Sequence, residues 1–250
     1  MIVANLNILL YKYRRMAEIT NWYDKIGINS AKKKLPSKWK NHHIYHNSMI
    51  LCIGPTGSGK TNALLDYIAR SSGEFYKIII CSFSTLDEPL YNFLKHKCDD
   101  VEFVNDVEEI PTLTEFDDET KNKPKLIIFD DFINLTKKEL KKINPYLISG
   151  RKYGFTVWLM AQEYVSIAKV ITRNIQYFLL YKINDNVSVD RIIKNHNMYN
   201  VDKDVFKKAY QLATKEPLSF FLIDLKSRDV KDRFRHGFLD VLKLKPDDEE

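Results

Sequence analysis

The feature that most constrains this chain is a glycine-rich turn that follows a short apolar run. The turn consists of Gly54, Pro55, Thr56, Gly57, Ser58, Gly59, Lys60 and Thr61. It fits the pattern G-x-x-x-x-G-K-[ST] and lies between a strand-like and a helix-like segment. Glycines let the backbone curl so that several N–H groups point at one phosphate chain, and the start of a helix adds partial positive charge. The pattern predicts a phosphate-binding loop, in which Lys60 reaches the β- and γ-phosphates and Thr61 holds Mg²⁺.

The alternative interpretation is an ordinary glycine-rich turn, which the strand before it and the helix after it disfavour. The rest of the chain also alternates apolar runs with amphipathic segments. The expected strands are 49–54, 77–82, 125–130, 155–161, 177–183 and 218–225, and the expected helices are 60–71, 87–97, 136–149, 187–197 and 202–213. Nearly uninterrupted apolar runs are typical of strands that are buried on both faces of a parallel sheet. The alternation predicts an α/β fold with right-handed crossovers and helices on both faces.

Two local features add detail to this expected fold. Thr136 is followed three residues later by Glu139, which predicts a capping box at the start of helix 136–149. Residues 99–124 are acidic and contain two prolines, so we expect a loop there. We divide the chain into a basic N-terminal extension at 1–44, a core at 45–226 and a C-terminal extension with an acidic tail at 227–250.

Composition narrows the class of protein. The chain has 250 residues and a net charge of +6, which is compatible with a nucleic-acid partner but does not establish one. Three widely spaced cysteines argue against a disulfide framework or a zinc site and for a reducing compartment. No run of 18 apolar residues occurs, so we expect no membrane span. The sequence leaves open whether Met1 or Met16 is the start of the protein.

A second chemical element follows the apolar run 126–129, which ends in two carboxylates. In a phosphate-loop protein the first carboxylate, Asp130, is expected in the Mg²⁺ shell. The second, Asp131, would reach toward the γ-phosphate and orient the attacking water. Two aspartates after a strand also occur in simple turns. Together with the phosphate loop, however, they indicate hydrolysis of a nucleotide rather than binding alone.

Three further polar residues are candidates for the same chemistry. Gln162 follows strand 155–161, and the carboxyl ends of parallel strands share one edge of a sheet, so it would polarise the water or sense the γ-phosphate. Arg151 precedes that strand and Arg173 precedes the next. An arginine delivered by a neighbouring subunit stabilises charge on the γ-phosphate. The alternative is a loop glutamine and two solvated arginines.

At this point the chain resembles a family. Six motifs stand in the order seen in viral DNA-packaging ATPases of the FtsK–HerA superfamily, which include poxvirus-type, large-DNA-virus and virophage enzymes. The motifs are residues 54–62, 84–89, 127–131, 150–151, 160–162 and 171–174. The resemblance covers residues 45–226.

The resemblance implies a RecA-like phosphate-loop fold of the additional-strand type and a homo-oligomeric ring. It also implies ATP as substrate, Mg²⁺ as cofactor, movement of double-stranded DNA and a capsid protein as partner. By motif, Asp131 corresponds to the catalytic carboxylate, Gln162 to the sensor and Arg151 to the finger in trans, with Arg173 as a second basic position. One departure is Asp131, where glutamate, longer by one methylene, is commoner. The resemblance also implies a virus-encoded protein that acts in the infected host cell and, in some cases, is part of the virion.

Other functions share the phosphate loop. A nucleoside or nucleotide kinase also contains it, but the chain shows no arginine-rich lid and no evident acceptor site. A nucleotide-switched assembly protein would need neither Asp131 nor Gln162. A helicase of this length would contain a single core and would have to act as a ring.

Overall fold

The computed structural model describes residues 25, 35–83, 88–98, 100–116, 119–196, 198, 201–227, 229 and 232–243. The chain divides into two compact units, Met1–Leu35 and Pro36–Glu250. The elements described below belong to the second unit. Met1, Met16, residues 84–87 of the second motif and the tail at 247–250 lie outside the described residues. The division at 44 and 226 stays a prediction.

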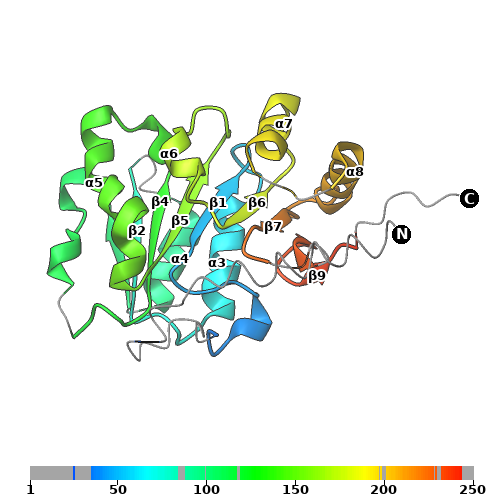
Figure 1. Ribbon diagram of the computed structural model, residues 1–250. Coiled ribbons are helices and arrows are strands. Elements are labelled where there is room, and N and C mark those ends of the chain that lie inside the picture. The colour runs from blue at the N-terminus through cyan, green and yellow to red at the C-terminus, as the bar shows by residue number, and fades with distance from the viewer. Residues whose placement is uncertain are drawn as a thin grey trace, which may run out of the picture. The chain divides into compact units, whose positions relative to one another are not determined.

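A nine-stranded sheet forms the centre of the described part of the second unit (Figure 1). Its order is β3-β2-β4-β5-β1-β6-β7-β8-β9. The strands are β1 (Met49–Ile53), β2 (Lys77–Ser82), β3 (Val101–Val104), β4 (Lys125–Asp130), β5 (Phe155–Ala161), β6 (Tyr177–Leu180), β7 (Phe221–Asp224), β8 (Phe234–His236) and β9 (Asp240–Val241). Pairing is parallel from β3 to β6 and antiparallel from β6 to β9. The predicted mostly parallel sheet is therefore confirmed.

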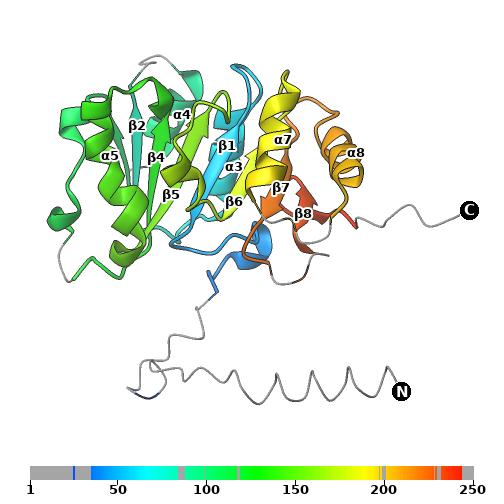
Figure 2. The same cartoon turned by 45° about the horizontal axis from the view of Figure 1, so that its top comes forward.

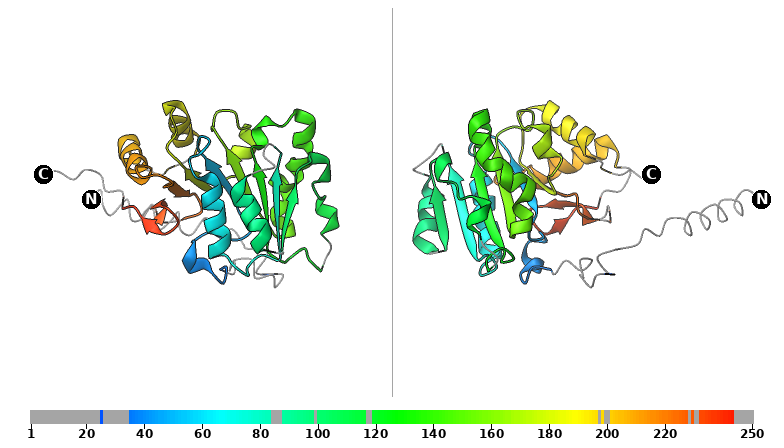
Figure 3. Two further views of the ribbon diagram at one scale, coloured as in Figure 1. Left: turned by 180° about the vertical axis from the view of Figure 1, so that it is seen from behind. Right: turned by 60° about the vertical axis from the view of Figure 1, so that its left-hand side comes forward.

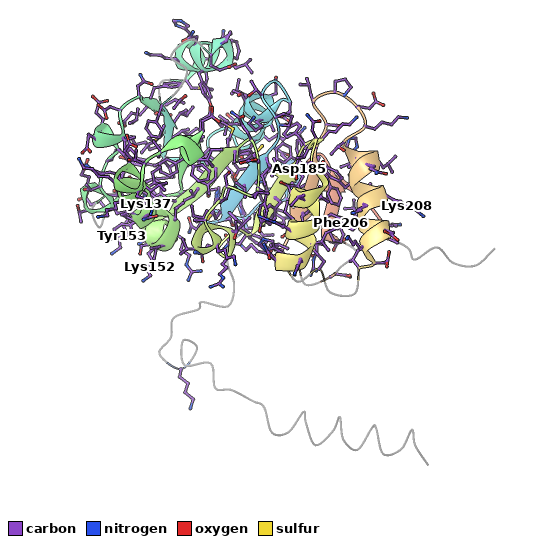
Figure 4. The ribbon with its side chains drawn as sticks, turned by 90° about the horizontal axis from the view of Figure 1, so that it is seen from above. Lys137, Lys152, Tyr153, Asp185, Phe206 and Lys208 are labelled. Carbon is purple, nitrogen blue, oxygen red and sulfur yellow. The ribbon has the colours of Figure 1, made fainter. Side chains whose placement is uncertain are left out.

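Helices cover both faces of this sheet. They are α3 (Lys60–Arg70), α4 (Pro89–Lys97), α5 (Lys137–Ser149), α6 (Lys169–Thr172), α7 (Asn186–Asn195) and α8 (Lys203–Ala213). In Figure 1, α5, α6 and α7 lie in front of the sheet. In the view from behind, on the left of Figure 3, α3 and α4 cover the opposite face. Figure 2 shows α8 beside α7. Figure 4 looks from above, with Lys137 of α5 and Phe206 of α8 labelled.

The alternation of side chains in β1 explains why its sequence is apolar throughout. Ile50 and Cys52 belong to the core cluster that includes α3 and α4, whereas Met49, Leu51 and Ile53 belong to the cluster that includes α5 and α8. All five are buried. A strand with helices on both faces has no solvated side, so both sets of positions are hydrophobic.

The capping box at the start of α5 is present as predicted. The Thr136 hydroxyl accepts a hydrogen bond from the Glu139 backbone N–H at 3.3 Å, and Glu139 Oε2 accepts one from the Thr136 backbone N–H at 2.7 Å. Two backbone donors at the helix terminus are thereby satisfied.

Three strands were not predicted. β3 lies within the stretch 99–124 that we expected to be a loop, and β8 and β9 lie within 227–250. They contain four, three and two residues, and β9 is exposed. Short strands toward the sides of a sheet need no long apolar run, so the sequence gives little signal for them. No helix among the described residues is long and apolar enough to cross a membrane.

Candidate functional site

The phosphate loop connects β1 to α3 and requires its glycines. Gly57 and Gly59 adopt φ angles of 77° and 107°, in the left-handed region that favours glycine. Gly54 has an ordinary φ, but a Cβ there would lie 2.6 Å from both Ser58 Oγ and Tyr181 Cβ. The backbone can therefore curl and pass close to its neighbours only because these positions have no side chain.

Lys60, the first residue of α3, folds back over this loop. Its Nζ donates hydrogen bonds to the carbonyls of Gly54 at 2.8 Å and Pro55 at 3.1 Å. The ammonium group is thus held above the curl of the backbone, next to the N-terminal end of a helix. Both features favour an anion, because the helix terminus and the amine contribute positive charge to the same place.

Tyr181, which follows β6, supports the loop from inside the protein. Its hydroxyl donates to the Gly59 carbonyl at 2.7 Å, and its backbone N–H donates to Ile53 O at 2.9 Å. Tyr210 of α8 donates in turn to the Tyr181 carbonyl at 2.9 Å. Sequence reasoning missed Tyr181, because a single aromatic residue after a strand carries no motif.

The two carboxylates stand where β4 ends. Asp130 Oδ2 accepts a hydrogen bond at 2.8 Å from the hydroxyl of Tyr91 on α4, a second residue that the sequence did not reveal. Burial raises the pKa of Asp130, and Asp131 adds to the rise, while the Tyr91 hydrogen bond and the Lys60 charge act in the opposite direction. A carboxylate that is desolvated in this way gains from a nearby cation. Asp131 has a φ of 50°, which turns the chain sharply after the strand.

These residues line one cleft of about 210 Å³. The structure brings together four groups there, which are the phosphate loop with the start of α3, the start of α4, the end of β4 and the end of β5. The lining residues are Thr56, Gly57, Gly59, Lys60, Thr61, Asn62, Glu88, Leu90, Asp130, Asp131 and Gln162. The sequence pattern therefore found most of the cleft, although Asn62 of α3 and Glu88 and Leu90 at the start of α4 were not among the predicted site residues. The individual roles of these side chains stay predictions.

A magnesium ion suits the donors of this cleft. Thr61 supplies a hydroxyl and Asp130 a carboxylate, and Mg²⁺ prefers oxygen ligands. The described residues contain no group of three or more His, Cys, Asp or Glu that would hold a metal ion. Mg²⁺ at nucleotide sites typically takes one or two protein ligands, and phosphate oxygens and water complete its shell. The donors thus fit an ion that arrives with a nucleotide.

The two candidate arginines lie near the amino ends of the strands, at the edge of the sheet opposite the cleft. Arg151 lines a separate cavity of about 130 Å³ with Met49 and Phe155, which are the first residues of β1 and β5. Arg173 precedes β6, and its neighbour Asn174 lines the same cavity. Five residues of β1 separate this edge from the phosphate loop, roughly 15 Å of extended chain. Neither arginine lines the cleft of its own chain.

Two of the histidines before β1, His42 and His46, contact Glu74 and do not line the cleft. His42 Nε2 lies 3.3 Å and His46 Nε2 3.7 Å from Glu74 Oε2, and the Lys38 backbone N–H donates to Glu74 Oε1 at 2.6 Å. Burial lowers the pKa of His42 to about 4 despite this carboxylate. The cluster fastens residues 37–46 to the loop that follows α3.

No protein-family model and no curated protein matches the sequence. Solved structures do match. The DNA-packaging ATPase B204 from Sulfolobus turreted icosahedral virus is 14% identical, over 77% of this chain and 98% of that one, with a TM-score of 0.53. The genome packaging NTPase B204 of Sulfolobus turreted icosahedral virus 2, in complex with ATP-gammaS, is 13% identical over the same shares, also with a TM-score of 0.53. EssC (ATPases 2 and 3) from Geobacillus thermodenitrificans is 12% identical over 81% of this chain and 41% of that one, with a TM-score of 0.51.

At such identities the likeness concerns the fold. In the sheet, β5 lies between β1, which carries the phosphate loop, and β4, which carries Asp130. That intervening strand is the arrangement that the additional-strand prediction requires. The chain therefore has the RecA-like α/β fold of phosphate-loop ATPases, and it is similar in fold to viral DNA-packaging ATPases and to the EssC ATPases.

Proposed function

We propose that the chain is an ATP-hydrolysing motor that moves double-stranded DNA and packages a viral genome into a capsid. The observation that carries this proposal is the single cleft that Lys60, Asp131 and Gln162 share with the rest of the phosphate loop. The fold likeness to proteins described as genome packaging NTPases supports the DNA substrate.

Binding of ATP begins at the phosphate loop. The N–H groups of residues 56–61 and the Lys60 amine hold the β- and γ-phosphates, and Lys60 exchanges its two carbonyl partners for phosphate oxygens. Thr61 and Asp130 hold Mg²⁺, which when bound neutralises charge on the β- and γ-oxygens. The nucleotide is therefore fixed with its γ-phosphate toward the ends of β4 and β5.

Hydrolysis requires a water opposite the leaving group. Asp131 accepts a hydrogen bond from that water and orients it, and Gln162 contacts the water or the γ-phosphate from the end of β5. The water oxygen bonds to the γ-phosphorus while the bond to the bridging oxygen breaks, so ADP and inorganic phosphate leave.

The positions of Arg151 and Arg173 fit catalysis between subunits. Each arginine is exposed and lies at the edge opposite the cleft. In a head-to-tail ring, one chain's arginine edge faces the cleft of the next. Arg151 then stabilises the charge that develops on the γ-phosphate, with Arg173 as a second basic group beside it. DNA would be held mainly through its phosphates in the ring, in the infected host cell, with a capsid protein as a further partner.

The test is ATP hydrolysis with and without duplex DNA, together with the mass of the assembly in the presence of an ATP analogue. We expect hydrolysis that DNA stimulates and a ring that forms with both ligands. Transfer of phosphate to nucleosides without DNA stimulation would instead indicate a kinase. Nucleotide binding without turnover, unchanged by Asp131→Asn, would indicate a switch.

A further inference from the structure

The contact between Tyr91 and Asp130 joins two elements that are distant in sequence. The hydroxyl of Tyr91 lies 2.8 Å from Asp130 Oδ2 and donates to it, although the two residues are 39 positions apart. The Tyr91 side chain is buried, with 5% of the residue exposed. Asp130 also lines the cleft, as Thr61 does.

This hydrogen bond limits how the carboxylate can turn. An aspartate side chain has two rotatable bonds, and a donor on one oxygen selects one orientation of the group. Hydrogen bonds to the ligands of a metal commonly fix their direction and affect the affinity for the metal as much as 10–100-fold. Tyr91 is in the correct place to act on Asp130 in this way.

The Tyr91 ring is held independently of its hydroxyl. It packs edge-on against Phe103 of β3, with ring centroids 6.0 Å apart. It also belongs to the buried cluster between α3, α4 and the sheet. Loss of the oxygen alone should therefore leave the ring in position, which makes the role of the hydroxyl testable.

We propose that Tyr91 is a positioning residue that orients Asp130 for the magnesium ion of a bound nucleotide. The proposal rests on the proposed function, because it assigns a magnesium nucleotide to the cleft. Glu88 and Leu90, which precede Tyr91, line the same cleft, so the start of α4 forms one wall of the nucleotide site as well as holding its metal ligand.

The experiment measures binding of a non-hydrolysable ATP analogue as Mg²⁺ is titrated from EDTA-treated protein. For Tyr91→Phe we expect unchanged affinity without Mg²⁺ and a half-saturating Mg²⁺ concentration about tenfold higher. The matched control is Tyr146→Phe, which removes a buried hydroxyl that donates at 2.6 Å to Pro111 O on the other face of the sheet. The control should keep the wild-type Mg²⁺ dependence.

Equal Mg²⁺ dependence in wild type and Tyr91→Phe would overturn the proposal, and so would a loss of affinity that is the same with and without Mg²⁺. A second comparison places Tyr91→Phe in an Asp130→Asn background. If Tyr91 acts through Asp130, it should change the Mg²⁺ dependence no further, and an additional shift would contradict this mechanism. Failure of the proposed function is recognised separately, because wild type would then show no DNA-stimulated hydrolysis, whereas the Mg²⁺ dependence of analogue binding is measured without DNA.

Discussion

The Tyr181 hydroxyl donates to the Gly59 carbonyl at 2.7 Å, so a residue of the β6 end supports the loop that follows β1. The same carbonyl also accepts the Ala63 N–H at 3.0 Å, within the first turn of α3. Tyr181→Phe should therefore leave no orphaned group and cost only about 1 kcal/mol of unfolding free energy. Nucleotide affinity should fall about fivefold, as roughly 1 kcal/mol of loop support is lost. Urea unfolding and analogue binding measure the two effects, and an unchanged affinity would show that the contact is structural only.

Gly57 and Gly73 offer a matched pair of backbone positions. Their φ angles are 77° and 78°, and a Cβ at either site would meet no atom within 4 Å. Substitution by alanine should therefore cost the same strain at both, about 1 kcal/mol. Only Gly57 lines the cleft, so only Gly57→Ala should weaken nucleotide binding, by tenfold or more. Equal loss of binding in both variants would mean that strain, and not the loop's approach to phosphate, is responsible.

Asp131→Asn should separate hydrolysis from binding. Asparagine tolerates the left-handed backbone at this position, where φ is 50°, so the fold should be kept. The amide cannot accept a proton or orient water as the carboxylate does, and we expect a loss of about 100-fold in turnover. Affinity for an ATP analogue should remain within twofold of wild type. A loss of binding instead would place Asp131 among the groups that hold the nucleotide.

Arg151 is tested by mixing subunits. Arg151→Ala alone should reduce turnover about 1,000-fold. Mixed with Asp131→Asn chains, it should regain activity, because rings then contain interfaces with an intact cleft and an intact arginine. Lys152→Ala is the control, because Lys152 is next to Arg151 in the sequence and is also an exposed basic residue (Figure 4). Mixtures that stay inactive would argue against action in trans.

The His42–Glu74 pair predicts acid sensitivity. The pKa of His42 falls from 6.5 to about 4 on folding, chiefly through burial, so its neutral form is the stable one. Burial would raise the pKa of Glu74, but hydrogen bonds from Lys38 and Ser37, together with the neighbouring His46 and His42, lower it. Stability from His42 is complete above pH 6.5 and is lost as the pH falls toward 4, whereas that from Glu74 is lost only below 4.5.

Urea unfolding at pH 7, 5.5 and 4.5 measures this loss. The decrease attributable to His42 should amount to as much as about 3 kcal/mol. In His42→Gln, which does not titrate, stability should start lower but decline less steeply over this range. Identical slopes in the two proteins would show that other groups account for the acid sensitivity.

Much of the site's position followed from the sequence, because local patterns determined it. A glycine-rich turn after a buried strand and a strand that ends in Asp130 were sufficient, since parallel strands end at one edge. The structure adds Tyr91 and Tyr181, which contact the site from 39 and 122 positions away. Such contacts depend on how α4 and β6 pack, and a single tyrosine gives no periodic signal from which this packing can be predicted.

The sheet was predicted less completely. Six strands were expected where long apolar runs occur, but β3, β8 and β9 have at most four residues each. The pairing of β3 with β2, of β8 with β7 and of β9 with β8 depends on tertiary structure, which hydrophobic periodicity does not encode.

The place of β5 in the sheet has one more consequence. Because it separates β1 from β4, the strand that leads into the Lys60 loop and the strand that ends in Asp130 lie two steps apart in the sheet, roughly 10 Å. This strand acts as a spacer that discourages the ammonium and the carboxylate from neutralising each other directly. Such a gap would suit a ligand that carries both signs of charge, such as a polyphosphate together with its metal ion.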